Sequence, residues 1–283
     1  MKILVKIGGA QLEHPDARSR FCAAVAAACR AGHEVLLVHG GGNQIRSVSE
    51  SMGLESRYHE GLRITDEATA EVALMVLGGL VNKRLVQSLT ANGTAAVGLT
   101  GADGGTFSAK KLTRAGVDLG FVGAVDQIDP SLVQTLLAAG TVPVLATVAP
   151  PTQHGGCEPF FNINADHAAG PLGYAFGCDV LLFLTDVPGV RNAKSETMPM
   201  MNDADCERLI ASGVAKGGMQ PKIEAAQLAA RANPQAIVKI ASAKGADCVL
   251  AALRDGAGTR FFSRRPVNAP VNANDDPQSE PVA

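Results

Sequence analysis

Short apolar runs alternate with segments of helical periodicity along most of the chain. The runs ILVKI (3–7) and EVLLVHG (34–40) are each followed by a segment whose apolar residues recur every three to four positions, the first over 15–31. A long helical segment at 66–93, a strand and loop at 94–105, and a helix and strand at 130–149 continue this order. Such βαβα alternation is typical of a mainly parallel sheet that helices cover on both faces.

The pattern changes at two places and ends before the C-terminus. The segment 109–129 (AKKLTRAGVDLGFVGAVDQID) interrupts the alternation and predicts a hairpin. A buried strand in CDVLLFLTDVPGV (178–190) renews the alternation. We therefore predict two lobes, at 1–175 and 176–263. The remaining residues, 264–283, are rich in Pro, Asn and Asp and lack periodicity, so we expect them to form a disordered tail.

Composition and charge exclude several classes of protein. The 283 residues are 46% hydrophobic and 18% charged, which is enough to bury a large core. The net charge of -2 gives no overall attraction to nucleic acid or to an anionic membrane. No uninterrupted apolar stretch reaches the roughly 20 residues of a membrane-spanning helix, and no signal-peptide pattern opens the chain. The six cysteines form no CxxC pair and no Cys/His cluster. We expect a cytoplasmic protein without nucleic-acid or membrane partners and without a protein-built metal site.

Glycines follow the first two predicted strands at the positions where a phosphate could bind. Lys6 lies near the end of the first run, and Gly8 and Gly9 follow it. This pattern fits a phosphate site, although a surface lysine on an edge strand before an ordinary turn fits it as well. Three consecutive glycines at 40–42 then leave bare backbone N–H groups at the start of a helix, which favours an anion. Neither a Walker A loop nor a GxGxxG fingerprint occurs.

An arginine precedes the long helical segment. In GLRITD, Arg63 comes shortly before a helix whose N-cap is Thr65 or Asp66. An arginine at this place can bind a carboxylate through two hydrogen bonds, and a solvated surface arginine is the alternative.

Polar side chains alternate in FNINADHAAG. Asn162, Asn164 and Asp166 are spaced by two residues, which places them on one face of an extended segment. Asparagines in such a place can bind the amino and carboxyl groups of a substrate, and Asp166 can hold lysines or a metal. The alternative is a turn that caps a helix from residue 167.

A second lysine lies at the start of a helix. In VAKGGMQPKIEAA, Gly217 and Gly218 precede a helix that begins near Pro221, and Lys222 is in its first turn. A positive charge there opposes the helix dipole, and a bound anion would remove this conflict.

Seven motifs, taken in order, resemble the amino acid kinase family: KIGG, VHGGG, GLRITD, GLTGADGG, NINAD, LTDVPGV and GGMQPK, over roughly residues 1–262. The resemblance implies an α/β fold, a three-layer αβα sandwich around a mainly parallel sheet, with an amino-acid lobe and a nucleotide lobe. It also implies transfer of the γ-phosphoryl group of ATP to the side-chain carboxylate of N-acetyl-L-glutamate, in arginine biosynthesis. Mg²⁺ would be held mainly by nucleotide phosphates.

The resemblance assigns roles to individual residues. Lys6 and Lys222 would stabilise the charge of the moving phosphoryl group, and Asp166 would orient both lysines. The substrate would be bound by Gly41, Gly42, Arg63 and Asn162, and the nucleotide by Gly8, Gly9, Asp186, Gly189, Gly217 and Gly218.

The resemblance also bears on assembly and leaves two rival functions. We expect a homodimer through the helix around 68–89, because its apolar residues exceed one stripe and Gly78 and Gly79 would allow close approach. The first strand starts at residue 2, which leaves no residues for the extra N-terminal helix of arginine-inhibited hexameric members; we therefore expect no feedback by arginine. One rival is a sister kinase for carrier-protein-bound aminoadipate or glutamate in lysine biosynthesis. The other is a non-catalytic amino-acid or nucleotide sensor of the same fold.

Overall fold

A large sheet forms the centre of the molecule. The computed structural model describes residues 1–113, 116–153, 155–215 and 218–263. The eight strands follow the order β12-β14-β13-β11-β1-β2-β8-β5, and every neighbouring pair is parallel except β13 and β14. This confirms the predicted mainly parallel sheet. The strands are β1 (Lys2–Ile7), β2 (Glu34–His39), β5 (Ala96–Leu99), β8 (Val142–Ala146), β11 (Val180–Thr185), β12 (Met200–Met201), β13 (Ile237–Ser242) and β14 (Thr259–Phe261).

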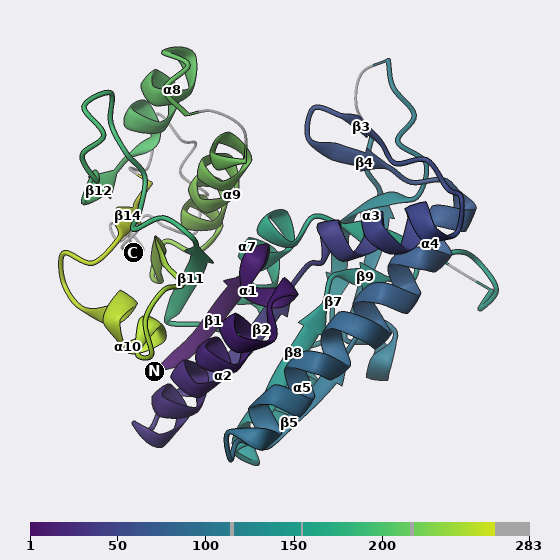
Figure 1. Cartoon of the computed structure of the whole chain (residues 1–283), viewed down its shortest axis with the longest axis horizontal. Helices are drawn as coiled ribbons and strands as arrows, with labels where there is room; N and C mark the ends of the chain where they lie inside the picture. Colours follow the sequence, from purple (N-terminus) through teal and green to yellow (C-terminus); the bar gives the residue numbers. More distant parts are fainter. Residues whose placement is uncertain (114–115, 154, 216–217, 264–283) are drawn as a thin grey trace, which may run out of the picture.

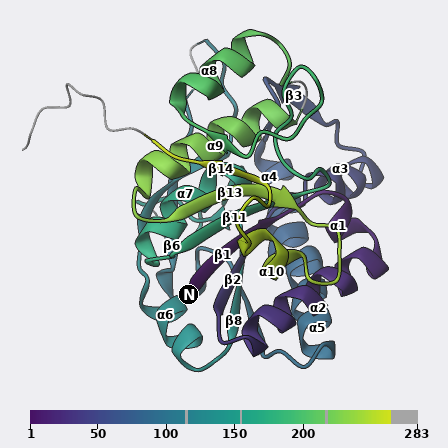
Figure 2. The ribbon, with the colours of Figure 1, turned by 90° about the vertical axis from the view of Figure 1, so that its left-hand side faces the viewer.

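Helices cover both faces of this sheet. Helices α2, α5 and α10 lie on one face, and α6, α7 and α9 lie on the other (Figures 1 and 2). The helices are α1 (Ala10–Glu13), α2 (Pro15–Arg30), α3 (Gly42–Ser51), α4 (Glu67–Leu74), η1 (Met75–Val81), α5 (Asn82–Ala91), η2 (Asp103–Gly105), α6 (Ser131–Ala138), α7 (Ala165–Ala175), α8 (Asp203–Ala211), α9 (Met219–Ala232) and α10 (Cys248–Leu253).

The central strand β1 shows how the two faces divide. Its odd-numbered side chains, such as Ile3 and Val5, belong to the apolar cluster under α2 and α5, and Leu4 belongs to the cluster under α7 and α9. Because successive side chains of a strand point to opposite faces, Lys6 lies on the same face as Leu4. Strand β1 is flanked by β11 and β2, and Lys6 is only 5% exposed. The alternative of a surface lysine on an edge strand is therefore wrong.

Two smaller sheets lie beside the large one. A four-stranded sheet has the order β6-β7-β10-β9, and β6 and β7 pair antiparallel, which confirms the hairpin predicted at 109–129. A separate hairpin of β3 and β4 precedes α4 and was not predicted. The strands are β3 (Arg57–His59), β4 (Leu62–Ile64), β6 (Phe107–Lys111), β7 (Val122–Ile128), β9 (Val148–Ala149) and β10 (Phe161–Ile163).

The predicted long helix consists of α4, η1 and α5. Of the two candidate N-caps, Asp66 has this role, because its side chain accepts a hydrogen bond from the backbone N–H of Thr69. The middle of the helix, η1, widens to a π-helix. A Cβ on Gly78 would lie 3.0 Å from the Thr100 side chain of the same chain, so a contact within the subunit already favours glycine there.

The same helix is the one element of the described residues that could cross a membrane by length and composition. It spans Glu67–Ala91. Core helices of folded domains pass the same test, and Val72, Leu77 and Leu85 of this helix are buried in the core of the chain. The predictions of a protein without a membrane segment and of a cytoplasmic location stay predictions.

The large sheet runs through both predicted lobes. Strand β11 pairs with β1 in continuous register, and β12, β14, α8 and α9 gather at one end of the molecule (Figure 1). The division between residues 175 and 176 stays a prediction. The predicted tail, 264–283, lies outside the described residues.

Candidate active site

Two lysines and one aspartate meet near the middle of the large sheet. The Nζ of Lys6 lies 2.7 Å from Oδ1 of Asp166, and the Nζ of Lys222 lies 3.0 Å from Oδ2. The side chain of Asp166 is 12% exposed and that of Lys6 is 6% exposed. A buried charge is tolerated when it is paired and hydrogen-bonded, so this carboxylate keeps both ammonium groups in place.

The start of α7 positions Asp166. Asn164 is the N-cap of this helix, and its side-chain oxygen accepts a hydrogen bond from the backbone N–H of Asp166 at 2.8 Å. The helix begins at Ala165 because this cap satisfies the free N–H groups of its first turn. The prediction of one extended face for Asn162, Asn164 and Asp166 is therefore wrong: Asn162 belongs to strand β10, and the capping alternative holds, two residues earlier than expected.

Close packing of α7 against α9 brings Lys222 to Asp166. Helix α9 begins at Met219, two residues before the predicted Pro221, and Lys222 lies one turn into it. A Cβ on Gly170 would lie only 3.1 Å from the Cα of Ala229, so the two helices approach each other backbone to backbone. The side chain of Lys222, in the first turns of α9, then reaches Asp166 at the start of α7.

The charges of the cluster shift its pKa values. Burial lowers the pKa of Lys6 to about 8, although Asp166 acts against this shift. Burial alone would raise the pKa of Asp166, but the charges of Lys6 and Lys222 outweigh it and lower that pKa to about 2. With both lysines protonated and one carboxylate between them, the cluster carries a net positive charge and attracts an anion.

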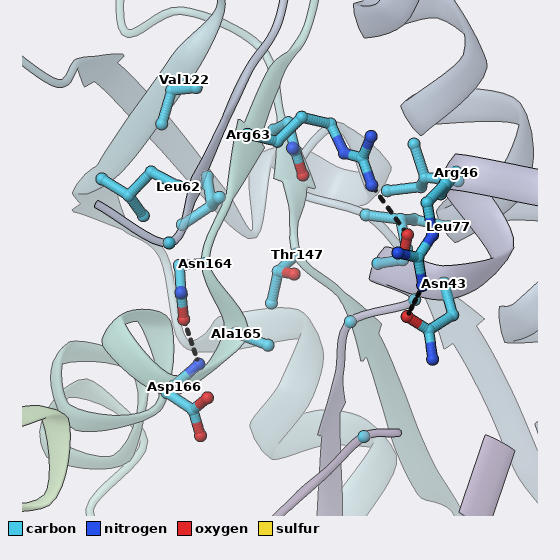
Figure 3. Close-up of a pocket in the computed structure, with 18 of the residues that line it drawn as sticks. Asn43, Arg46, Leu62, Arg63, Leu77, Val122, Thr147, Asn164, Ala165 and Asp166 are labelled. Atoms are coloured by element: carbon cyan, nitrogen blue, oxygen red, sulfur yellow. Dashed lines mark hydrogen bonds between the residues drawn. The ribbon is translucent and has the colours of Figure 1, made fainter. Parts of the chain in front are cut away.

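A cavity of about 370 Å³ opens on one side of the cluster. Figure 3 shows Asp166 and Arg63 on opposite sides of this cavity, with Thr147 between them in this view. We call it the acceptor cavity. Among the predicted site residues it is lined by Lys6, Gly8, Gly9, Gly41, Gly42, Arg63, Asn162 and Asp166.

Arg63 is a buried cation on strand β4. Its guanidinium donates hydrogen bonds to Oγ of Ser56 at 2.7 Å and to the carbonyl oxygen of Gly42 at 2.8 Å, and it lies 4.7 Å from the ring centre of Tyr58. Burial lowers its pKa, but a guanidinium remains charged. None of the ion pairs among the described residues involves Arg63. The surface-arginine alternative is therefore wrong, and the cavity offers this cation to an anionic ligand.

The glycine loop after β2 adds backbone donors to the same cavity. Gly41 is the N-cap of α3 and provides no side-chain cap, so the first N–H groups of this helix have no partner within it. A Cβ on Gly41 would lie 2.9 Å from Leu77 of η1, so this glycine is also required for packing. The loop thus presents free N–H groups to a ligand.

Two further cavities lie beyond the carboxyl ends of strands β1 and β11. The first, of about 190 Å³, is lined by Lys6, Gly8, Gly9, Asp186 and Lys222, with Gln11, Leu184 and Thr185; we call it the phosphate cavity. The second, of about 600 Å³, lies between residues 187–195, which include Gly189, and residues 209–215 with Met219; we call it the outer cavity. Gly218 is the N-cap of α9, and Gly217 lies outside the described residues.

Packing explains why residue 189 is a glycine. A Cβ there would lie 2.7 Å from Oγ1 of Thr259 and 2.8 Å from Cγ2 of Thr197. The hydroxyl of Thr259 also accepts a hydrogen bond from the backbone N–H of Val190 at 2.9 Å. This contact fixes the loop after β11 at the wall of the outer cavity.

Comparison with known proteins places the chain in a family. The model of the amino acid kinase family matches residues 1–239. This chain belongs to the amino acid kinase family. Two relatives of this kinase are named acetylglutamate kinase. The one from Koribacter versatilis (strain Ellin345) is 44% identical over 82% of this chain and 87% of its own length. The one from Methanopyrus kandleri is 40% identical over 81% of this chain and 91% of its own length.

Solved structures share the fold. N-acetylglutamate synthase from Neisseria gonorrhoeae, in complex with coenzyme A and N-acetyl-glutamate, matches 93% of this kinase and 60% of its own chain with a TM-score of 0.80 and 19% identity. Carbamate kinase from Giardia lamblia bound to AMP-PNP matches 93% of this kinase and 98% of its own chain with a TM-score of 0.67 and 16% identity. These likenesses show the fold and confirm the predicted fold class.

Several residues of the kinase's cavities escaped the sequence analysis. Tyr58, Arg46 and Thr147 line the acceptor cavity, and Gln11 lines the phosphate cavity. The hairpin that carries Tyr58 has strands of three residues, which are too short for a periodic signal. Thr147 lies between two short strands, where its hydroxyl and N–H both donate to the carbonyl oxygen of His39.

Proposed function

We propose that this kinase transfers the γ-phosphoryl group of ATP to the side-chain carboxylate of N-acetyl-L-glutamate, a step of arginine biosynthesis. The relatives named acetylglutamate kinase, at 44% and 40% identity, support this acceptor. One structural observation carries the proposal: the acceptor cavity and the phosphate cavity share Lys6, Gly8 and Gly9 as a common wall. Two ligands that occupy the two cavities would meet beside Lys6.

The cluster suits transfer between two anions. Phosphoryl transfer needs positioning and neutralisation of charge, and it needs little covalent chemistry from the protein. Lys6 and Lys222 would stabilise the charge on the moving phosphoryl group from opposite sides. Asp166 would act as a positioning residue, because it contacts both ammonium groups and keeps them apart from each other.

The far end of the acceptor cavity would hold the α-carboxylate of the substrate. Arg63 uses two of its N–H groups for Ser56 and Gly42, which leaves further donors for a carboxylate. Asn162 and the free N–H groups at the start of α3 complete the polar wall. Leu62 and Val122 add apolar surface to the same cavity.

The nucleotide would extend from the phosphate cavity into the outer cavity, past Asp186 and Gly189. Mg²⁺ belongs to this proposal as an ion carried by the nucleotide. No group of three His, Cys, Asp or Glu side chains in the described part of the chain could hold a metal, and both oxygens of Asp166 contact lysines. Phosphate oxygens and water would therefore supply most of its ligands.

An acceptor panel tests the proposed function. Purified protein with ATP and Mg²⁺ is offered N-acetyl-L-glutamate, L-glutamate, L-aspartate, L-2-aminoadipate and a carrier protein that bears aminoadipate. We expect ADP release to be fastest with N-acetyl-L-glutamate. Preference for the carrier-bound amino acid would support the sister kinase instead. No turnover with any acceptor, together with intact nucleotide binding, would support the sensor.

The pKa of Lys6 predicts the pH dependence of the reaction. Lys6 is charged below its pKa of about 8 and loses the charge above it, so kcat/KM of the free enzyme will fall as the pH rises through about 8. In the Lys6→Arg variant this fall should disappear, since a guanidinium stays charged, although the rate at neutral pH will be lower. Initial rates between about pH 6 and pH 10 provide the measurement. A wild-type profile that stays level throughout would contradict the role of Lys6.

Arg63→Lys will weaken binding of the acceptor more than binding of ATP. An ammonium group cannot replace the fork of the guanidinium, so we expect KM for N-acetyl-L-glutamate to rise about tenfold and KM for ATP to change little. Steady-state kinetics with each substrate varied in turn measure both constants. Arg57→Lys, on the exposed hairpin strand β3, is the matched control and should resemble the wild type. An equal rise in both KM values would contradict a carboxylate clamp.

We also propose that the kinase forms a homodimer through the helix α4–η1–α5. Met75 is 52% exposed and Leu80 is 36% exposed on η1, and Val97 on the edge strand β5 is exposed as well. Because Leu77 of the same helix contacts the glycine loop, pairing here would also support the acceptor cavity. Light scattering at micromolar concentration should give twice the chain mass of 29.1 kDa. Leu80→Glu should shift this mass toward the monomer. A stable wild-type monomer, or a hexamer that persists on dilution, would contradict the proposal.

A further inference from the structure

A glutamine side chain lines the phosphate cavity and has no role so far. Gln11 is the second residue after Gly9 and lies in the short helix α1. Gln11 as a whole is 8% exposed, so more than nine-tenths of its surface is buried. The other polar side chains around this cavity are Lys6, Lys222, Asp186 and Thr185.

The side-chain amide of Gln11 lacks a partner among the described residues. The lysines are held by Asp166, and the hydroxyl of Thr185 donates to Oδ1 of Asp186 at 3.0 Å. No hydrogen bond of the described residues involves the Gln11 side chain. The amide atoms are not among the fully buried polar atoms without a partner, so they face the open cavity and can bind a ligand or water directly.

The charges around the amide select the ligand. Two ammonium groups line the phosphate cavity, which favours an anion with several acceptor oxygens. The amide of Gln11 offers two N–H donors without adding charge. A phosphate group matches this set, because its oxygens can accept hydrogen bonds from the lysines and from the amide at the same time.

We infer that Nε2 of Gln11 donates a hydrogen bond to the terminal phosphate of the bound nucleoside triphosphate. The position favours the terminal group because the phosphate cavity adjoins the acceptor cavity at Lys6, Gly8 and Gly9. The remainder of the nucleotide would occupy the outer cavity, beyond Asp186. This inference rests on the proposed function, in which the phosphoryl group moves between these two cavities.

Nucleotide binding without an acceptor tests the inference. Titration calorimetry with Mg²⁺ gives Kd for AMP-PNP, which carries a terminal phosphate, and for ADP, which lacks it. Gln11→Met keeps the length of the side chain and removes the amide; we expect Kd for AMP-PNP to rise about tenfold and Kd for ADP to change less than about twofold. Gln11→Glu places a negative charge beside the phosphate and should weaken the binding of AMP-PNP further. Gln134→Met, exposed on α6, is the matched control and should bind both nucleotides as the wild type does.

The outcomes separate clearly. A selective loss of AMP-PNP affinity in both Gln11 variants, with ADP binding retained, supports the inference and shows that the variants are folded. Unchanged affinity for AMP-PNP overturns it, and so does an equal loss for AMP-PNP and ADP. Because the titration needs no acceptor, a wild-type protein that fails to phosphorylate N-acetyl-L-glutamate would contradict the proposed function without altering this test.

Discussion

Replacing Lys6 or Lys222 by alanine will lower kcat by about 100- to 1000-fold, while the affinity for ADP falls much less. Each ammonium group lies beside the carboxylate of Asp166; Lys6 is at the wall between the two cavities, and Lys222 lines the phosphate cavity. There each group acts mainly on charge that develops on the phosphoryl group during transfer. Single-turnover rates with N-acetyl-L-glutamate and calorimetric Kd values for ADP separate the two effects.

The lysine variants are expected to fold, because one lysine still pairs with Asp166 in each of them. Lys110→Ala is the matched control: its side chain is 67% exposed and pairs with Asp126, and neither residue lines any of the three cavities. This control should keep the wild-type kcat. Near-normal kcat in either Lys6→Ala or Lys222→Ala would show that the lysine in question does not stabilise the transferred group.

The variant Asp166→Asn will lose both activity and stability. Its amide leaves two ammonium groups close together without a negative partner, and breaking a buried ion pair in this way costs about 3 kcal/mol of unfolding free energy. Lys6 limits the cost by giving up its proton, so the variant should become more stable as the pH rises toward 8. Urea unfolding at several pH values measures the free energy.

The acid range gives a second check on Asp166. The pKa of Asp166 is about 2 in the folded protein, against an ordinary value of 3.8. Its contribution to the free energy of unfolding is therefore fully present above about pH 4 and is lost as the pH falls toward 2. The difference in unfolding free energy between the wild type and Asp166→Asn should shrink over the same pH range. Asp247→Asn breaks an exposed pair with Arg254 and should cost less than about 1 kcal/mol at any pH. An Asp166→Asn protein as stable as this control would contradict the buried ion pair.

Local patterns in the chain were sufficient for the main elements of the fold. The apolar runs of β1, β2 and β11 and the periodic helices between them predicted a mainly parallel sheet, because period and length are local properties of the chain. The glycine loops and the ordered motifs predicted which segments carry the site. The π-helical turn at η1 was not visible, since the same residues also fit a regular helix.

Ambiguous local signals were decided by hydrogen bonds. Asn164 has the spacing of a strand residue and the chemistry of an N-cap, and the structure makes it the cap of α7. Arg63 fits a surface or a clamp equally well in sequence; its burial depends on the β3–β4 hairpin and on contacts with Ser56 and Gly42. Periodicity does not report these partners: the Asn164 side chain bonds to the backbone N–H two residues on, and Arg63 bonds to residues 7 and 21 positions earlier.

The sequence by itself determined which residue types could bind an anion: lysines after a strand and in an early helical turn, and glycines that leave backbone N–H groups free. Only the tertiary structure decided that these residues meet. Asp166 and Lys222 are 56 positions apart, and they touch because Gly170 lets α7 and α9 approach closely. Lys6 joins them because β1 runs through the centre of the sheet with that side chain facing α7. Gln11 carries no periodic or motif signal, and its burial beside two cations arises from packing between segments distant in the chain.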